Sequence, residues 1–207
     1  MAPRFAPATE TAISLYLIEQ DQLQSWLSDQ SAPLQDWVAT NGFTGGAGQA
    51  LLVPAGDGET PIALAGYGTA AQRRRKRFTL AGAAEKLPKG CYQLQTGSPN
   101  VAQLDAEALS TECLGWLLSQ YRFTRYKNAA PMAASLIAPA ELDAPAVEAL
   151  AAAEYLTRDL INTPAADMGP AQLEEAVQAL AAEFEASVGV IGGADLLEAN
   201  LPLIHSV

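Results

Sequence analysis

The sequence has few of the features that mark membrane or secreted proteins. None of its apolar runs approaches the roughly 20 residues of a membrane-spanning helix, so no such helix is expected. The N-terminus, residues 1–5, lacks the charged and then apolar layout of a secretory signal, and Glu10 interrupts the following residues early. Hydrophobic residues nevertheless make up 49% of the 207 residues, enough for a sizeable core. The sequence therefore predicts a folded cytoplasmic protein.

Cysteine and histidine are also scarce. The two cysteines, Cys91 and Cys113, stand 22 residues apart and form no Cys-x-x-Cys motif. Two buried free thiols are therefore favoured, and a disulfide is the alternative. The single histidine, His205, has the apolar neighbours Ile204 and Val207. A catalytic histidine needs a nucleophile and an orienting partner, which the sequence does not place beside it. The apolar neighbours predict a histidine packed in a core.

Basic residues are outnumbered, with 12 against 23 acidic ones and a net charge of −11. An acidic total disfavours nucleic acid as the main partner, because phosphate binding needs a positive face. Residues 71–130 reverse the balance, with ten basic and four acidic side chains. The basic residues are densest at Arg73–Arg77, and this run predicts the solvated start of a helix. Alternatively, this basic run binds either an acidic surface on a partner subunit or nucleic acid. Of these two partners, the subunit is favoured.

The first 140 residues alternate short apolar strands with amphipathic helices. Periodicity and β-branched residues predict strands at residues 11–18, 50–53, 61–65, 91–96 and 133–138. Caps and helical spacing predict helices that begin near Asp21 and Pro33 and helices over 78–87 and 105–121. This order predicts an α/β sandwich with a mostly parallel or mixed sheet.

The pattern then becomes mainly helical. An alanine-rich run predicts a helix that ends near Asn162, because Pro164 disfavours helical geometry at the residue before it. A second helix is predicted to begin at Pro170. A strand at residues 188–191 and a short helix at 196–199 are predicted to follow.

Two glycine-rich segments have some likeness to nucleotide-binding motifs. Gly66–Ala71 follows a strand, and Glu85 stands 17 residues after Gly68, near the offset expected for an acid that binds a ribose. The third glycine of that motif is an alanine here, so a strand-to-helix turn is favoured. Gly42–Gly48 lacks the Gly-Lys-Ser/Thr ending of a phosphate loop. We therefore predict that it is a flexible loop that connects to the next strand. The alternative function is a stand-alone module that binds a nucleotide-like ligand or a partner.

Three further segments carry a family resemblance: Tyr121–Lys127, Arg158–Pro170 and Gly193–Val207. Together they resemble the N-terminal portion of the leucine aminopeptidase (leucyl or cytosol aminopeptidase) family. The glycine-ended strand Ala65–Gly68 also stands where members have a Gly-x-Gly. Ala166 departs from the pattern, since many members carry asparagine there.

The resemblance implies a domain order and an activity. Residues 1–140 would form a non-catalytic, macro-like α/β sandwich, 141–162 a connecting helix, and 163–207 the truncated start of a second α/β domain, the metallopeptidase catalytic domain. Whole family members are hexameric hydrolases that release N-terminal residues, preferably leucine, from peptides. They use two divalent metals, Zn or Mn, to activate water.

The family's metal-binding and catalytic motifs do not occur in this sequence. We therefore expect no catalytic, cofactor-binding or metal-binding residue, and a chain that is inactive alone and serves assembly. The carboxylates after Pro170 are predicted to be solvated: Glu174, Glu175, Glu183, Glu185, Asp195 and Glu198. We also expect residues 163–207 to form an incomplete β-α-β portion with uncovered apolar surface.

Overall fold

The computed structural model describes residues 2–56, 60–130 and 132–206. The chain divides into two compact units, one up to Asp159 and one from Leu160. Among the described residues, no helix combines the length and the apolar character needed to cross a bilayer.

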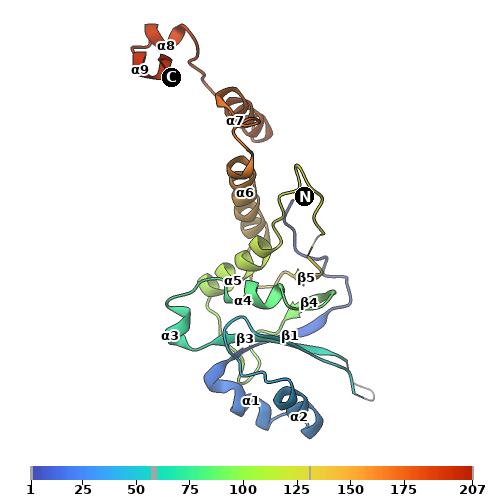
Figure 1. The fold of residues 1–207 in the computed structure, drawn as a ribbon. Helices are drawn as coiled ribbons and strands as arrows, with labels where there is room; N and C mark the ends of the chain where they lie inside the picture. Colours follow the sequence, from blue (N-terminus) through green and yellow to red (C-terminus); the bar gives the residue numbers. More distant parts are fainter. Residues whose placement is uncertain (1, 57–59, 131, 207) are drawn as a thin grey trace. The chain divides into compact units, whose positions relative to one another are not determined.

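A five-stranded mixed sheet forms the centre of the first unit (Figure 1). Its order is β2-β3-β1-β4-β5, and β2 pairs antiparallel with β3 while the other neighbours pair in parallel. The strands are β1 (Ile13–Glu19), β2 (Ala50–Val53), β3 (Ile62–Gly68), β4 (Gly90–Leu94) and β5 (Ala134–Ile137). The predicted mixed-sheet α/β fold is therefore confirmed. The third strand extends further than the predicted 61–65, because β1 continues to pair with it at Gly66 and Gly68.

Two helical layers cover the sheet because successive strand residues point to opposite faces. In β1, Leu15 and Leu17 pack toward α4 (Thr79–Ala84) and α5 (Ala106–Ser119), whereas Tyr16 and Ile18 pack on the other side. That other side is covered by the short helices α1 (Leu23–Ser28) and α2 (Ala32–Thr40), which follow the 3-10 turn η1 (Gln20–Gln22). Figure 1 shows the two layers on opposite faces of the sheet.

A buried carboxylate joins α4 and α5. Helix α4 has no side-chain cap of its own, since Phe78 precedes it in the left-handed conformation. Glu112 of α5 lies 5% exposed, and its Oε2 accepts a hydrogen bond of 2.7 Å from the Leu80 N–H. Glu112 thus satisfies an amide at the start of α4 that would otherwise lack a partner. The helix is shorter at both ends than the predicted 78–87, and at its start Phe78 lies outside it because of this conformation.

The helix α6 (Ala144–Asn162) begins in the first unit, where Val147 and Ala151 join the core. It ends before Pro164, as predicted, and α7 (Pro170–Glu183) begins at the predicted proline. The second unit also contains α8 (Asp195–Glu198) and α9 (Pro202–His205).

The predicted strand at residues 188–191 is wrong. These residues form neither helix nor strand, and Val188, Val190 and Ile191 lie 42–54% exposed. A strand needs hydrogen bonds from a neighbouring strand. Within the described part of the chain, no segment pairs with residues 188–191.

Candidate functional site

Two of the segments that carry the family resemblance, Tyr121–Lys127 and Arg158–Pro170, meet at the C-terminal end of α5. Tyr121 follows this helix, and its hydroxyl donates a 2.8 Å hydrogen bond to Asp159 Oδ1 on α6. The rings of Tyr121 and Tyr155 meet edge to face, with centroids 5.1 Å apart. The Arg158 guanidinium lies 5.4 Å from the Tyr121 ring centroid. We name these four residues, Tyr121, Tyr155, Arg158 and Asp159, the α5–α6 clasp.

The clasp also satisfies the last carbonyl groups of α5. Tyr155 donates a 2.6 Å hydrogen bond to Leu117 O, and Arg158 approaches Leu118 O at 3.4 Å. Arg122 donates to Ser119 O at 2.8 Å. Terminal carbonyls of a helix have no partner within it, and cations are favoured beside them. Burial raises the pKa of the Tyr155 phenol, and the nearby Arg158 and Arg122 oppose that shift. The clasp thus fixes the start of the Arg158–Pro170 motif on the first unit.

The glycine segment Gly66–Ala71 does not form a phosphate cradle. The Gly66 N–H donates to Gln49 O at 2.9 Å, and the Gly68 N–H donates to Gly45 O at 2.8 Å. Gly66 is needed because a Cβ there would collide with Gly46 O. The helix that follows, α3 (Ala70–Arg73), has only four residues. The amides that a phosphate would need are therefore largely engaged within the protein.

The basic run Arg73–Arg77 divides into one anchored residue and four exposed ones. Arg73 ends α3 instead of starting a helix, so that prediction is wrong. Its guanidinium pairs with Glu19 Oε1 at 3.0 Å and lies 4.3 Å from the Tyr67 ring centroid. Arg74 to Arg77 are exposed, as a solvated run predicts. Burial is the main cause that raises the pKa of Tyr67 to about 12, and Arg73 opposes it.

The remaining polar candidates are all exposed. His205 is exposed on α9, so the predicted core position is wrong; its neighbours Leu203 and Ile204 are exposed as well. Glu85 is also exposed. The carboxylates that the sequence placed in solvent are exposed: Glu174, Glu175, Glu183, Glu185, Asp195 and Glu198. Among the residues that the structure describes, no three His, Cys, Asp or Glu side chains gather as a metal site would require.

Both cysteines are free thiols. Cys113 is buried, and burial raises the pKa of its thiol to about 12. Cys91 is half-buried rather than fully buried, and burial again raises its thiol pKa. A raised pKa lowers the thiolate fraction, which makes both thiols poor nucleophiles at neutral pH.

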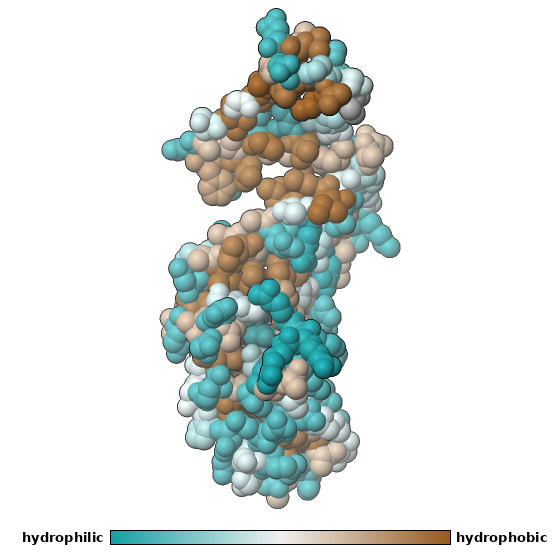
Figure 2. All heavy atoms as spheres, turned by 90° about the vertical axis from the view of Figure 1, so that its left-hand side faces the viewer, coloured by the Kyte–Doolittle hydropathy of each residue, from teal (hydrophilic) through white to brown (hydrophobic). Residues whose placement is uncertain are grey.

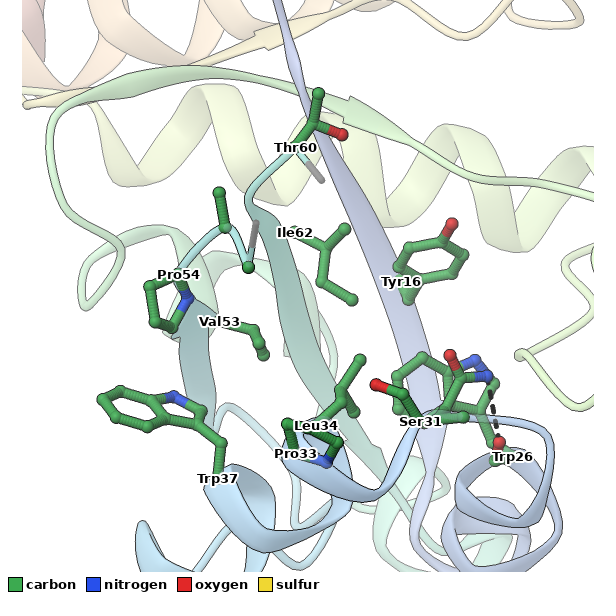
Figure 3. Close-up of a pocket in the computed structure, with 13 residues that line it drawn as sticks. Tyr16, Trp26, Ser31, Pro33, Leu34, Trp37, Val53, Pro54, Thr60 and Ile62 are labelled. Atoms are coloured by element: carbon green, nitrogen blue, oxygen red, sulfur yellow. Dashed lines mark hydrogen bonds between the residues drawn. The ribbon is translucent and has the colours of Figure 1, made fainter. Parts of the chain in front are cut away.

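Sequence reasoning missed a pocket on the face of the sheet that α1 and α2 cover (Figure 3). All three tryptophans fall at helical core spacing, and Trp26 and Trp116 are indeed 3% and 0% exposed. Trp37, however, is 40% exposed and lines the pocket. Helical spacing gives the apolar face of α2 but does not tell how far the sheet extends beneath it. No signal in the sequence distinguishes Trp37 from a core residue.

A mixed five-stranded sheet between two helical layers, with a long helix clasped to it, defines the class: a layered α/β domain. A family model for the M17 aminopeptidase N-terminal domain matches residues 13–139, from β1 to just beyond β5, and the chain belongs to this family. The suspected kinship with leucine aminopeptidases is thereby confirmed.

Individual relatives agree with this membership. A probable cytosol aminopeptidase of Leifsonia xyli subsp. xyli is 29% identical over 163 residues, covering 74% of this chain and 32% of the relative. The crystal structure of the Coxiella burnetii cytosol aminopeptidase matches with a TM-score of 0.79 and 32% identity, over 92% of this chain and 40% of that one. The bottromycin maturation enzyme BotP, in a complex with Mn, shares the fold with a TM-score of 0.67 and 24% identity, over 91% and 40% of the two chains. The chain thus spans about a third to two fifths of these relatives.

Proposed function

We propose that this chain is the N-terminal portion of a cytoplasmic two-metal aminopeptidase that removes N-terminal residues, preferably leucine, from peptides. The observation that carries the proposal is the family match over residues 13–139, which is followed directly by the clasped helix α6. The name of the Leifsonia relative, a cytosol aminopeptidase, supports both the activity and the compartment.

The proposal assigns a role to each part of the chain. Residues 1–140 form the non-catalytic domain, 141–162 connect, and 163–207 begin the catalytic domain. The apolar face of α7 supports this division: Leu173, Val177 and Leu180 recur at helical spacing and are 40–48% exposed. Such a face normally packs against further structure.

The chain's own residues do not fit a two-metal centre. Two metals that share a hydroxide need several convergent carboxylates. In the described residues the carboxylates after Pro170 are exposed, and no group of three potential ligands gathers. We therefore assign the two divalent ions, Zn or Mn, to the part of family members that this chain does not cover. The manganese complex of BotP is in keeping with that choice.

The role left to this chain is assembly, and by resemblance the assembled form is a hexamer. The clasp supports this role because it fixes the helix through which residues 1–140 connect to the catalytic segment. The exposed Arg74–Arg77 would then face an acidic surface of another subunit rather than nucleic acid.

Two measurements test the proposal. The purified 207-residue chain, loaded with Mn²⁺ or Zn²⁺, should not hydrolyse a leucine anilide above the buffer rate, whereas the Coxiella aminopeptidase serves as the positive control. Metal-dependent hydrolysis by the chain alone would contradict the assigned roles. In a chimera, residues 1–162 of this chain replace the corresponding segment of the Coxiella enzyme. It should assemble to the native mass and retain activity; a folded chimera that stays monomeric would overturn the assembly role.

A further inference from the structure

A pocket of about 690 Å³ opens between the helices α1 and α2 and the sheet (Figure 3). Trp37 and Pro54 lie at one end and Tyr16 at the other, with Leu34 and Ile62 between them. This volume falls within the range of roughly 300–1,000 Å³ of small-molecule sites. The pocket lies on the face opposite α4 and α5, away from the α5–α6 clasp.

The walls are aromatic and their orientation is fixed. The Trp37 Nε1–H donates a 3.1 Å hydrogen bond to Leu52 O on the edge strand β2. Trp26 is 3% exposed and its ring lies 5.8 Å from that of Tyr16, between centroids. The bond to Leu52 holds the Trp37 indole while the residue stays 40% exposed. Flat rings held in this way offer stacking and edge-to-face contacts to another ring.

The lining residues that the structure describes are uncharged but not wholly apolar. Among the described residues that line the pocket, none carries a charge at neutral pH. Ser31 precedes α2 without using its hydroxyl as a helix cap. Within the same described part of the chain, the Tyr16 hydroxyl has no hydrogen-bond partner. A charged ligand would lose hydration here without gaining an opposite charge, whereas a neutral polar group could bond to these hydroxyls.

We propose that this pocket binds a neutral aromatic molecule that carries a hydrogen-bonding group such as a carboxamide. The ring packs between Trp37 and Tyr16, and the polar group bonds to the hydroxyls of Tyr16 and Ser31. This site is independent of the proposed peptidase role, because none of its residues belongs to the clasp or to residues 163–207.

Three probes of similar size separate the contributions: benzamide, benzoate and cyclohexanecarboxamide. Each is titrated into the ¹⁵N-labelled chain while the indole N–H signals of the three tryptophans are followed. Benzamide should shift the signals of Trp26 and Trp37 in a saturable way and leave that of Trp116 unchanged, since Trp116 is 0% exposed in the opposite layer. Benzoate, which brings a charge, and cyclohexanecarboxamide, which lacks the aromatic ring, should each bind about tenfold more weakly.

Two variants test the location of the site. Leu34→Trp fills the pocket and Trp37→Ala removes one wall, and each should weaken benzamide binding about tenfold, with the Trp26 signal as reporter. Phe184→Ala removes an exposed ring of the second unit and should leave binding unchanged. A well-dispersed amide spectrum verifies that each variant is folded. Absence of a saturable shift, equal binding of all three probes, or unchanged binding in folded Leu34→Trp would each overturn the proposal.

Discussion

The two units of this chain use apolar residues in opposite ways. In the first unit Leu15 and Trp116 are 0% exposed, packed in a continuous core. In the second unit Phe184 is 71% exposed and Leu203 is 83% exposed. Apolar side chains of this second unit lie open in the space-filling view (Figure 2). Apolar residues are therefore present in both units, but among the described residues only the first unit has a sheet and packed helices that bury them.

The helices α5 and α7 allow a direct comparison of the two units, since each has 14 residues. Helix α5 buries six residues between α4 and the sheet, whereas α7 buries none. Both show apolar residues at helical spacing. Periodicity thus predicts which face of a helix is apolar, while burial depends on whether another element lies against that face.

The largest expected difference is in amide hydrogen exchange. The amides of α5 should open only with global unfolding, because its buried face joins the core of the first unit. The amides of α7 should exchange through local opening, at least about a thousandfold faster. Exchange followed by mass spectrometry on the 207-residue chain measures both helices in one sample. Equally strong protection throughout 163–206 would refute the view that this segment is incompletely packed.

A pair of leucine substitutions gives the next largest effect. Leu136 is 1% exposed in β5, so Leu136→Ala should lower the free energy of unfolding by about 2–5 kcal/mol through lost contacts and a cavity. Leu203→Ala makes the same chemical change at an 83% exposed position and should alter the free energy of unfolding by less than about 0.5 kcal/mol. Urea unfolding followed by far-UV circular dichroism suits both, since helices of both units contribute to that signal. Similar losses in the two variants would mean that Leu203 is covered in solution.

Much of the first unit could be predicted from the sequence because its signals are local. Strand residues such as Leu15 and Leu17 alternate, and Pro164 and Pro170 mark where one helix ends and the next begins. The family resemblance added the position of the domain, and two of its segments, Tyr121–Lys127 and Arg158–Pro170, meet in the clasp.

The failures have a common cause, which is dependence on residues distant in sequence. Residues 188–191 have strand-like composition, but a strand also needs a neighbour to pair with. His205 lies among apolar residues, yet those residues are exposed too. Arg73 is part of a uniform basic run in the sequence, and only its contact with Glu19, 54 positions away, distinguishes it from the other residues of that run. The clasp likewise joins Tyr121 to Asp159 across 38 positions.

A third test compares single hydrogen bonds in the two units. Tyr155→Phe removes the 2.6 Å bond to Leu117 O at the half-buried clasp and should cost about 1 kcal/mol of unfolding free energy. Ser206→Ala removes a 2.9 Å bond to Leu203 O that is exposed, where water replaces the hydroxyl at little cost. Both are measured by the same urea unfolding. An unaffected Tyr155→Phe variant would show that the clasp adds no stability to the first unit.

The smallest expected effect is a pH trend from Glu112. Burial raises the pKa of this carboxyl above its ordinary 4.5, and the N–H groups of Leu80 and Thr79 that donate to it oppose the shift. Because the folded-state pKa is the higher one, the unfolded chain loses this proton first as pH rises. The carboxyl's contribution to stability therefore falls as pH rises from about 4.5 through the raised folded-state pKa.

Glu112→Gln cannot titrate, so its stability relative to the parent chain should improve steadily between pH 4 and pH 7. The comparison is the slope of that difference, not its absolute value, because the amide also changes the hydrogen bond to Leu80. If the difference for Glu112→Gln is flat over this range, or falls with rising pH, the hydrogen bonds to the carboxylate outweigh its burial. The buried charge would then stabilise the junction of α4 and α5 rather than weaken it.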